Sequence, residues 1–524
     1  MRMRYCMAAT ERGQWQSRLG FIMAAAGSAI GLGNIVFFGA NAYKYGAGAF
    51  YLPYLIALFC VGIPVMVLEL GLGSMTRRAF PPSLHRIAGR FGEFWGWFSL
   101  LSATLITMYY ITILAWCLGM LLGALGPLWQ PEQHLTAFKE IGTLPNPTGY
   151  FFEMISQWST VLFVVIIWAA NLFVISRGVQ TIEWVNKIFL PLMWVFMGLL
   201  ILRGITLPNG LEGLYLLFTP NFEVMSNIEV WKGAFSQIFF TLSLGFGIMT
   251  AYASYLPKDA DQVSNPLIIS FMNCGFEFIA GIAIFTMLFS FSIVPKASTL
   301  SMTFFVIPEG IARMPGGSLM VQAFGVLFFV LLLLAGITSS VSLVEGLASA
   351  LIDKFESSRR ALVGVFATAG CLGSVAFALP LVVDPGLASN GTLGLTLIDL
   401  VDHWAFGYGL LIGGLMECIL VGWFFGADKL RAHINQHAKI PLPPFFDILI
   451  KWVIPAVLLF IIGSSAWQEL KGIYGHDFTI VGLQPWLPWV CFAVFALGGI
   501  LLALLLTFAR DYHHPHSHEE ELAQ

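Results

Sequence analysis

The segment 27–34, which reads GSAIGLGN, lies inside an otherwise apolar stretch near the start of the chain. Glycine costs about 1 kcal/mol relative to alanine at each helix-interior position, so its repeated use weakens a helix here. Broken backbone hydrogen bonds are not tolerated against lipid, so an interrupted membrane helix must be buried in protein or line a cavity. A second segment, 241–247 (TLSLGFG), repeats the pattern. Paired interruptions in the two halves of a membrane protein indicate the binding site of a transporter.

The composition of the chain is that of a membrane protein. Of 524 residues, 58% are hydrophobic and only 10% are charged, whereas a soluble protein carries about 25% charged residues. A membrane-crossing helix needs about 20 predominantly apolar residues. The sequence therefore predicts an all-α integral membrane protein with twelve transmembrane helices, near 15–42, 47–75, 92–124, 158–176, 182–203, 231–256, 265–294, 317–353, 361–380, 395–425, 448–467 and 486–509.

The basic residues indicate an orientation. Most of the 26 lysines and arginines fall in connections that this topology places on one side. Positively charged loops stay in the cytoplasm, so we expect both termini there. We predict one transmembrane domain over residues 1–510. The polar tail 511–524 (DYHHPHSHEEELAQ) is predicted to be disordered, because such a composition cannot bury a core.

Short polar side chains coincide with the two interruptions. Hard cations such as Na⁺ prefer oxygen ligands, which inside a membrane come from unwound backbone carbonyls and a few side chains. Such oxygens occur at Asn34, Thr241, Ser243 and Asn273, and in the run 335–340 (AGITSS). Taken singly, each has a structural alternative, because Ser and Thr often bond their own or a neighbouring helix. Their coincidence with two glycine-rich breaks favours a sodium site.

Two half-helix ends also suit a zwitterion. Helix N-termini carry partial positive charge and C-termini partial negative charge, so a carboxylate and an ammonium group could each meet exposed backbone. Tyr110 offers a hydroxyl that could steady the carboxylate, although Tyr109 and Tyr110 could equally pack in a helix bundle.

Three carboxylates lie at membrane depth: Glu69, Glu277 and Glu417. Intramembrane ionisable residues are costly and are functional hypotheses by default. A buried hydrogen bond made by the protonated form is the competing interpretation.

These motifs resemble those of the neurotransmitter:sodium symporter family, particularly its prokaryotic members. The similarity covers nearly the whole chain, and its most specific stretches are 31–34 (GLGN), 48–50 (GAF), 237–247 (QIFFTLSLGFG), 252–255 (YASY) and 335–340 (AGITSS). The resemblance implies alternating access in a prokaryotic plasma membrane. It also implies two inverted five-helix repeats with interrupted helices 1 and 6, at about 12–205 and 228–426, followed by peripheral helices at about 448–510.

The resemblance further implies two sodium sites. One would use the Ala29 carbonyl, Asn34, Thr241, Asn273 and the substrate carboxylate. The other would use carbonyls of Gly27, Ile30 and Ala335 and the hydroxyls of Thr338 and Ser339.

The substrate contacts that the resemblance implies are Ser28, Ala29, Leu32, Gly33, Ile106, Tyr110, Phe240, Thr241, Ser243, Phe246, Ser339 and Leu343. Relatives that carry amines without a carboxylate place an aspartate where this chain has Gly31, so an amino acid is expected here. The mostly apolar pocket favours an aliphatic or aromatic side chain. A methylene group discriminates by only about 1–3 kcal/mol, so leucine, methionine and phenylalanine all remain candidates.

Glu277 and Glu69 are the expected charge-compensating residues. Glu277 stands where chloride-dependent relatives have a serine, and a fixed carboxylate would supply the negative charge that chloride otherwise brings. The resemblance therefore implies chloride independence, and proton antiport if the Glu277 proton takes part in the return step.

The gates match the family pattern in part. At the inner gate Arg12 and Asp353 can pair, with Trp15, Ser254 and Tyr255 beside them. At the outer gate many relatives read RFP where this chain has Phe37-Phe38-Gly39, so the arginine expected to bridge Asp402 is missing. Lys44, two turns later, could replace it; otherwise Phe37 forms an apolar or water-mediated gate and Asp402 pairs elsewhere.

Two functions from different classes remain. The leading hypothesis is a sodium-coupled symporter that imports a hydrophobic amino acid, and the alternative is a non-transporting amino-acid sensor with a transporter fold. An enzyme is not expected, because no nucleophile–base pair, metal-ligand spacing or phosphate loop falls outside these motifs. We expect sodium, an amino acid and the bilayer as partners, no nucleic acid, and either a monomer or a homodimer.

Overall fold

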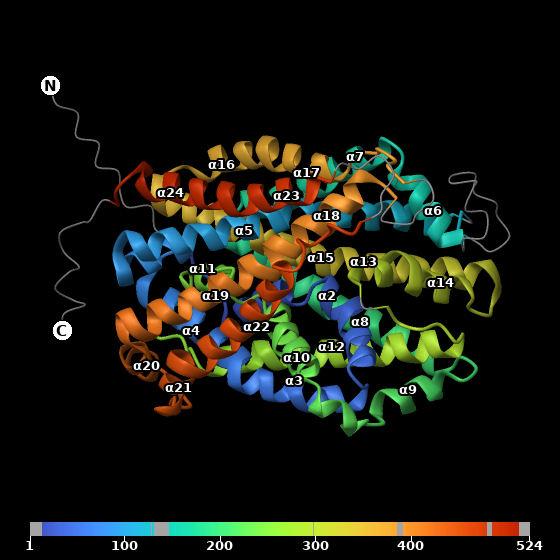
Figure 1. Cartoon of the computed structure of the whole chain (residues 1–524), viewed down its shortest axis with the longest axis horizontal. Coiled ribbons are helices and arrows are strands. Elements are labelled where there is room, and N and C mark those ends of the chain that lie inside the picture. The colour runs from blue at the N-terminus through green and yellow to red at the C-terminus, as the bar shows by residue number, and fades with distance from the viewer. Residues whose placement is uncertain are drawn as a thin grey trace.

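The computed structural model describes residues 13–126, 128–129, 146–296, 298–384, 391–478 and 485–512. Within these ranges the regular elements are helices, joined at two points by isolated bridges, Ala47 with Pro220 and Val382 with Thr392. Most of the long helices lie side by side along the longest axis of the molecule (Figure 1). Arg12 and the tail from residue 513 onward lie outside the described residues.

Ten helical runs in the described ranges are long and apolar enough to cross a membrane. They are Gly48–Thr76 (ending in α4, Ile63–Thr76), Phe80–Leu125 (α5), Ser159–Ser176 (α7), Val179–Ile205 (α8), Ser264–Ser290 (α12), Gly317–Phe355 (α15), Arg359–Phe377, Leu393–Asn435 (containing α18, Leu393–Trp404, and α19, Leu410–Ile419), Phe445–Glu469 and Leu487–Ala509 (ending in α24, Gly499–Ala509). Each coincides with one of the predicted spans.

The other two predicted spans are both interrupted. α1 (Arg18–Ala29) and α2 (Leu32–Lys44) pass the length and hydropathy test only together, and they are bent by 54° at the break. The predicted span 231–256 is divided into α10 (Ile228–Thr241) and α11 (Ile248–Ala253), each too short to cross alone. By length, the described residues therefore contain ten or eleven membrane-spanning helices rather than twelve. The difference arises because glycine-rich backbone replaces the middle of the predicted span 231–256.

The interior of the bundle is built around α5 and α15, which pack along each other, while α12 packs against α2 and α8. Large apolar side chains are exposed on α7 and on α24, including Leu162, Phe173, Leu501 and Phe508. Contiguous exposed apolar surface of this kind marks an interaction face, here the one expected to meet lipid.

The tail 511–524, predicted to be disordered, begins with two residues that the structure describes. Asp511 accepts a hydrogen bond of 2.8 Å from Arg90, and the Tyr512 hydroxyl donates one of 3.0 Å to Glu93. Tyr512 reaches a polar cluster near the N-terminal end of α5. Its hydrogen bond to Glu93 holds it there, although the sequence around it is polar.

Candidate ion and substrate site

The first interruption consists of Ile30 and Gly31, both in extended conformation between α1 and α2. The Gly31 N–H donates to Asn34 Oδ1 at 2.8 Å, so the Asn34 side chain caps the start of α2. Leu32 N lies 3.4 Å from the Tyr110 hydroxyl of α5. The break thus places the C-terminus of α1 and the N-terminus of α2, which carry opposite partial charges, beside the Tyr110 hydroxyl.

The second interruption covers residues 242–247. Ser243, Gly245 and Gly247 have positive φ of 53°, 77° and 70°, a region that glycine enters at little cost. A Cβ on Gly245 would lie 2.7 Å from the Leu410 carbonyl oxygen, and one on Gly247 would lie 2.4 Å from Phe80. Both the backbone angles and the close packing therefore require glycine at these two positions.

The residues assigned to the first sodium site meet where the two interruptions face each other. Asn34 Nδ2 donates to Thr241 Oγ1 at 2.7 Å and to Asn273 Oδ1 at 2.8 Å. The Asn273 side-chain amide also lies 3.3 Å from the carbonyl oxygens of Ala29 and Thr241, and its nitrogen donates to both in the flipped orientation. The carbonyl and side-chain oxygens gathered here are of the kind that a hard cation takes as ligands. The donor set therefore fits Na⁺.

The residues assigned to the second sodium site also converge. The Ser339 hydroxyl lies 3.0 Å from the Ser28 carbonyl oxygen, 3.1 Å from that of Ala335 and 3.4 Å from that of Ile30. The Thr338 hydroxyl bonds the Ala335 carbonyl at 2.8 Å. One hydroxyl can donate only one proton, so acceptors exceed donors at this point. An excess of oxygen acceptors again fits a cation.

Gly31 lies at the centre of the space expected for the substrate carboxylate. A Cβ on Gly31 would lie 3.0 Å from Ser339 Oγ and 3.2 Å from the Tyr110 hydroxyl oxygen, whereas a Cβ on Gly33 would meet no atom within 4 Å. A side chain at position 31 would crowd both hydroxyls. Glycine leaves them accessible at the N-terminus of α2.

The expected apolar wall is divided among three parts of the fold. Ile106 of α5 and Leu343 of α15 are buried on helices that pack together, and Phe246 is buried in the second interruption. Phe240, at the end of α10, is half-buried and stacks on Phe406 with ring centroids 4.1 Å apart.

Glu277 is fully buried and accepts hydrogen bonds from three side chains. Gln237 Nε2 donates at 2.7 Å and the Thr241 hydroxyl at 2.8 Å, both to Oε1, while the Tyr54 hydroxyl donates to Oε2. Three converging donors are suited to a negative charge. Thr241 links this carboxylate directly to the first ion cluster.

Glu69 supports the second interruption. Its Oε1 accepts the Gly245 N–H at 2.7 Å, and the Ser99 hydroxyl donates to the Gly245 carbonyl. Glu417, on α19, interacts electrostatically with Glu69 and has no hydrogen-bond partner for either carboxyl oxygen. Glu69 is thus placed to hold the unwound backbone, a position different from that of Glu277 beside the ion cluster.

At the outer gate, Asp402 is joined to Tyr109 of α5, whose hydroxyl donates to Oδ1 at 2.5 Å. Lys44 lies over the ring of Tyr45, with Nζ 5.0 Å from its centroid. Phe37 is half-buried on α2. Asp402 therefore has a tyrosine partner where the family resemblance led us to expect an arginine.

At the inner gate, Trp15 is anchored to the segment after the second interruption. Trp15 Nε1 donates to the Tyr252 carbonyl at 2.8 Å, and the Tyr255 hydroxyl donates to Glu345 Oε1 at 2.9 Å. Glu345 also pairs with Arg359 at 2.5 Å. The predicted pairing of Arg12 with Asp353 lies outside the described residues.

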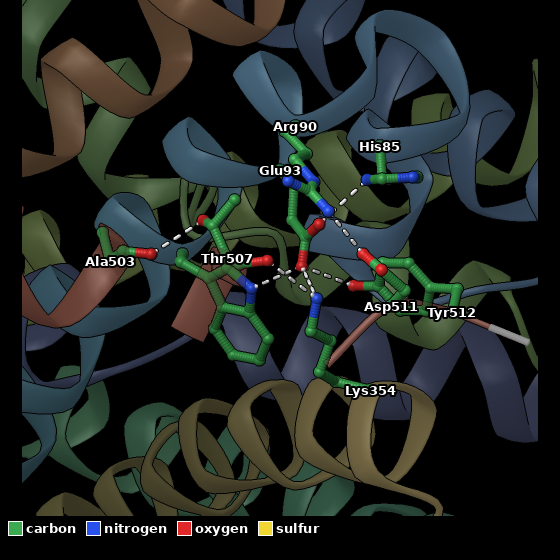
Figure 2. A network of polar contacts seen from close by, with 9 residues as sticks. His85, Arg90, Glu93, Lys354, Ala503, Thr507, Asp511 and Tyr512 are labelled. Carbon is green, nitrogen blue, oxygen red and sulfur yellow. Dashed lines mark hydrogen bonds and ion pairs between the residues drawn. The ribbon is translucent and has the colours of Figure 1, made fainter. Parts of the chain in front are cut away.

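Asp353 itself accepts the Ala79 N–H at 2.7 Å and lies 3.8 Å from Arg78. The next residue, Lys354, is buried and forms an ion pair of 2.6 Å with Glu93. Figure 2 shows His85, Lys354 and Tyr512 directed toward that carboxylate from three segments. Tyr512 is thus held close to Asp353, a predicted gate residue.

Several of these partners were not identified from the sequence, namely Tyr54, Gln237, Tyr109, Glu93 and Lys354. Gln237 had a usable signal, because it precedes Thr241 by four residues and so shares its helix face. The others are brought to their partners by contacts between distant segments.

Comparison with known proteins shows the family of this chain. The model of the sodium:neurotransmitter symporter family matches residues 12–132 and 152–511. The chain belongs to the sodium:neurotransmitter symporter family. It is 38% identical over 490 residues to an uncharacterised sodium-dependent transporter of Methanocaldococcus jannaschii, covering 90% of this chain and 93% of that one.

Other symporters of the family are more distant. The sodium- and chloride-dependent GABA transporter 2 of Bos taurus is 29% identical over 472 residues, covering 82% of this chain and 75% of that one. The crystal structure of MhsT in complex with L-phenylalanine is similar with a TM-score of 0.72 and 28% identity, covering 87% of this chain and all of that one. The family and its relatives are transporters rather than enzymes.

Proposed function

We propose that this chain is a sodium-coupled symporter that imports a hydrophobic amino acid by alternating access across a prokaryotic plasma membrane, with both termini in the cytoplasm. The observation that carries the proposal is the convergence of Ala29, Asn34, Thr241 and Asn273 at two facing helix breaks. These oxygens form one proposed sodium site, and those around Thr338 and Ser339 form the second. Both sites adjoin the accessible backbone at Gly31.

An amino-acid substrate is supported by the chemistry at the first break. The Tyr110 and Ser339 hydroxyls lie within 3.2 Å of the position that a side chain on residue 31 would occupy. A substrate carboxylate fits there, beside the N-terminus of α2, where the helix dipole favours an anion. The Phe240–Phe406 stack and the buried Ile106 and Leu343 support an apolar substrate side chain.

Chloride independence and proton antiport are also proposed, on the evidence of Glu277. A buried carboxylate held by three donors supplies a negative charge close to the first ion cluster. Its protonation on the return step would carry a proton in the opposite direction to the sodium ions.

The test is uptake of labelled leucine, methionine and phenylalanine into proteoliposomes. We expect an inward sodium gradient to drive accumulation of at least one of them, and an imposed potassium gradient to drive none. A sodium gradient that leaves the accumulation of every common amino acid unchanged would rule out the symporter.

The same preparation separates the symporter from the sensor alternative. Sodium-dependent binding of an amino acid to the purified protein, without uptake into vesicles, would favour a sensor. Uptake with a rate that saturates with substrate excludes it.

A further inference from the structure

Asn186 of α8 is a buried polar residue that has no part in the sites described above. It is 2% exposed, its Nδ2 donates to the Ile182 carbonyl at 2.8 Å, and its Oδ1 has no hydrogen-bond partner among the described residues. Only the nitrogen of the amide can donate to that carbonyl. This bond therefore fixes the amide and directs Oδ1 away from its own helix.

The free oxygen faces Gly27 of α1. A Cβ on Gly27 would lie 2.0 Å from Asn186 Oδ1 and 3.7 Å from the Cβ of Thr338. Asn186 and Thr338 thus flank the same glycine from α8 and α15, and any larger residue at position 27 would collide with the amide. A weak Cα–H···O contact with Gly27 uses only part of the acceptor capacity of Oδ1.

The other buried acceptor on this side of α8 is already satisfied. Glu183, three residues before Asn186, accepts from the Ser17 hydroxyl at 2.8 Å, from the Gln16 N–H at 2.8 Å and from Lys187 at 2.6 Å. Asn186 Oδ1 has no such donor. It is an oxygen acceptor that lies against Gly27, whose carbonyl is one of the oxygens proposed to hold the second sodium ion.

We propose that Asn186 contributes its Oδ1 to the second sodium site, as a sixth oxygen beside those of Gly27, Ile30, Ala335, Thr338 and Ser339. Hard cations take neutral amide oxygens as ligands, and an unpaired buried acceptor carries a desolvation cost that a cation relieves. Asn186 thereby sets the sodium affinity of that site. This inference rests on the proposed sodium-coupled function.

The experiment is a sodium titration of the thermal stability of the purified protein, which needs no transport. Asn186→Leu removes the oxygen while keeping a similar volume. We expect the sodium concentration that gives half of the stabilisation to rise about tenfold, which corresponds to about 1.4 kcal/mol. Asn186→Asp keeps a side-chain oxygen next to Gly27 but loses the bond to Ile182, so sodium affinity at or above that of the wild type would show that the oxygen itself is the ligand.

Gln262 offers a matched control. It is 2% exposed, neither amide atom has a hydrogen-bond partner, and it lies in the connection between α11 and α12. Gln262→Leu therefore removes an equally buried, unpaired amide, and its sodium titration should match that of the wild type.

A purely structural role predicts something different. In that case Asn186→Leu would lower the unfolding temperature equally with and without sodium, and its half-maximal sodium concentration would stay within twofold of the wild type. Either this result or an equal shift in Gln262→Leu would overturn the inference. Should Asn186→Leu fail to fold, Asn186→Ala is read by the same criterion.

The sodium titration of Thr338→Ala tests the second sodium site itself. It therefore distinguishes failure of the Asn186 inference from failure of the proposed sodium-coupled function. If Thr338→Ala shifts the sodium titration and the Asn186 variants do not, Asn186 has no role and the second site stands. If none of them shifts it, the second sodium site itself is wrong.

Discussion

Thr241 shows how one residue can serve both an ion site and its charge balance. Its hydroxyl donates to Glu277 at 2.8 Å, which leaves the lone pairs of the oxygen directed to Asn34 and Asn273. The proton is committed to the carboxylate, so the oxygen acts only as an acceptor toward the Asn34 and Asn273 side chains. One side chain at the second helix break thus links the proposed ion site to the Glu277 carboxylate.

Thr338→Ala should weaken sodium dependence, because it removes a hydroxyl that lies 2.8 Å from the Ala335 carbonyl in the second cluster. Loss of one oxygen ligand should raise the sodium concentration for half-maximal uptake about tenfold. Maximal uptake at saturating sodium should change less. Unchanged sodium dependence would show that Thr338 is not a ligand.

Uptake by the wild type should survive replacement of chloride by gluconate, because Glu277 supplies a fixed negative charge. Glu277→Ser should make uptake chloride-dependent, since the Tyr54, Gln237 and Thr241 donors remain and would converge on the anion. Uptake rates in chloride and in gluconate provide the measurement. A large chloride effect in the wild type, or none in the variant, would contradict the role given to Glu277.

Whole elements meet near the N-terminal end of α5, where α15 and Tyr512 pack around Glu93. The ion pair with Lys354 is almost completely buried, with both side chains 1% exposed. Glu93 also accepts from Trp97, Tyr512 and His85 (Figure 2). The Glu93 carboxylate therefore joins α5, α15 and the segment around Tyr512 next to Asp353.

Lys354→Met should destabilise the protein strongly, because it leaves the buried charge of Glu93 without its partner. Breaking a buried ion pair costs about 3–5 kcal/mol. The matched control is Arg313→Met, at the residue that follows α14 (Ile307–Ala312). Arg313 is 51% exposed, and its pair with Glu309 is worth about 0.2–1 kcal/mol. The midpoint of unfolding in detergent measures both, and similar shifts in the two variants would contradict the argument.

At the scale of the whole molecule, the two interruptions draw distant helices into one binding region. α1, α2, α5, α10, α12 and α15 each contribute at least one of its residues. Ligands that bind this region only in the folded protein must stabilise the whole bundle. The two proposed sodium ions and the amino acid should therefore act together.

Removal of sodium should abolish stabilisation by the amino acid, because the substrate carboxylate is proposed to complete the first ion site. At a ligand concentration about 100 times the dissociation constant, the stabilisation should be about 2.7 kcal/mol. A thermal-shift screen of the twenty amino acids, with sodium and with potassium, measures it. Equal shifts in the two salts would contradict the coupling.

The amino-acid sequence by itself determined the membrane class, the predicted spans, the two breaks and the types of oxygen beside them. Hydropathy and glycine content act locally, so residues 27–34 and 241–247 could be recognised without any knowledge of packing. Tertiary structure alone decided that Tyr109 binds Asp402, that Tyr54 donates to Glu277 and that Tyr512 is fastened to Glu93. These partners are far apart in the chain, and their meeting depends on how whole helices cross.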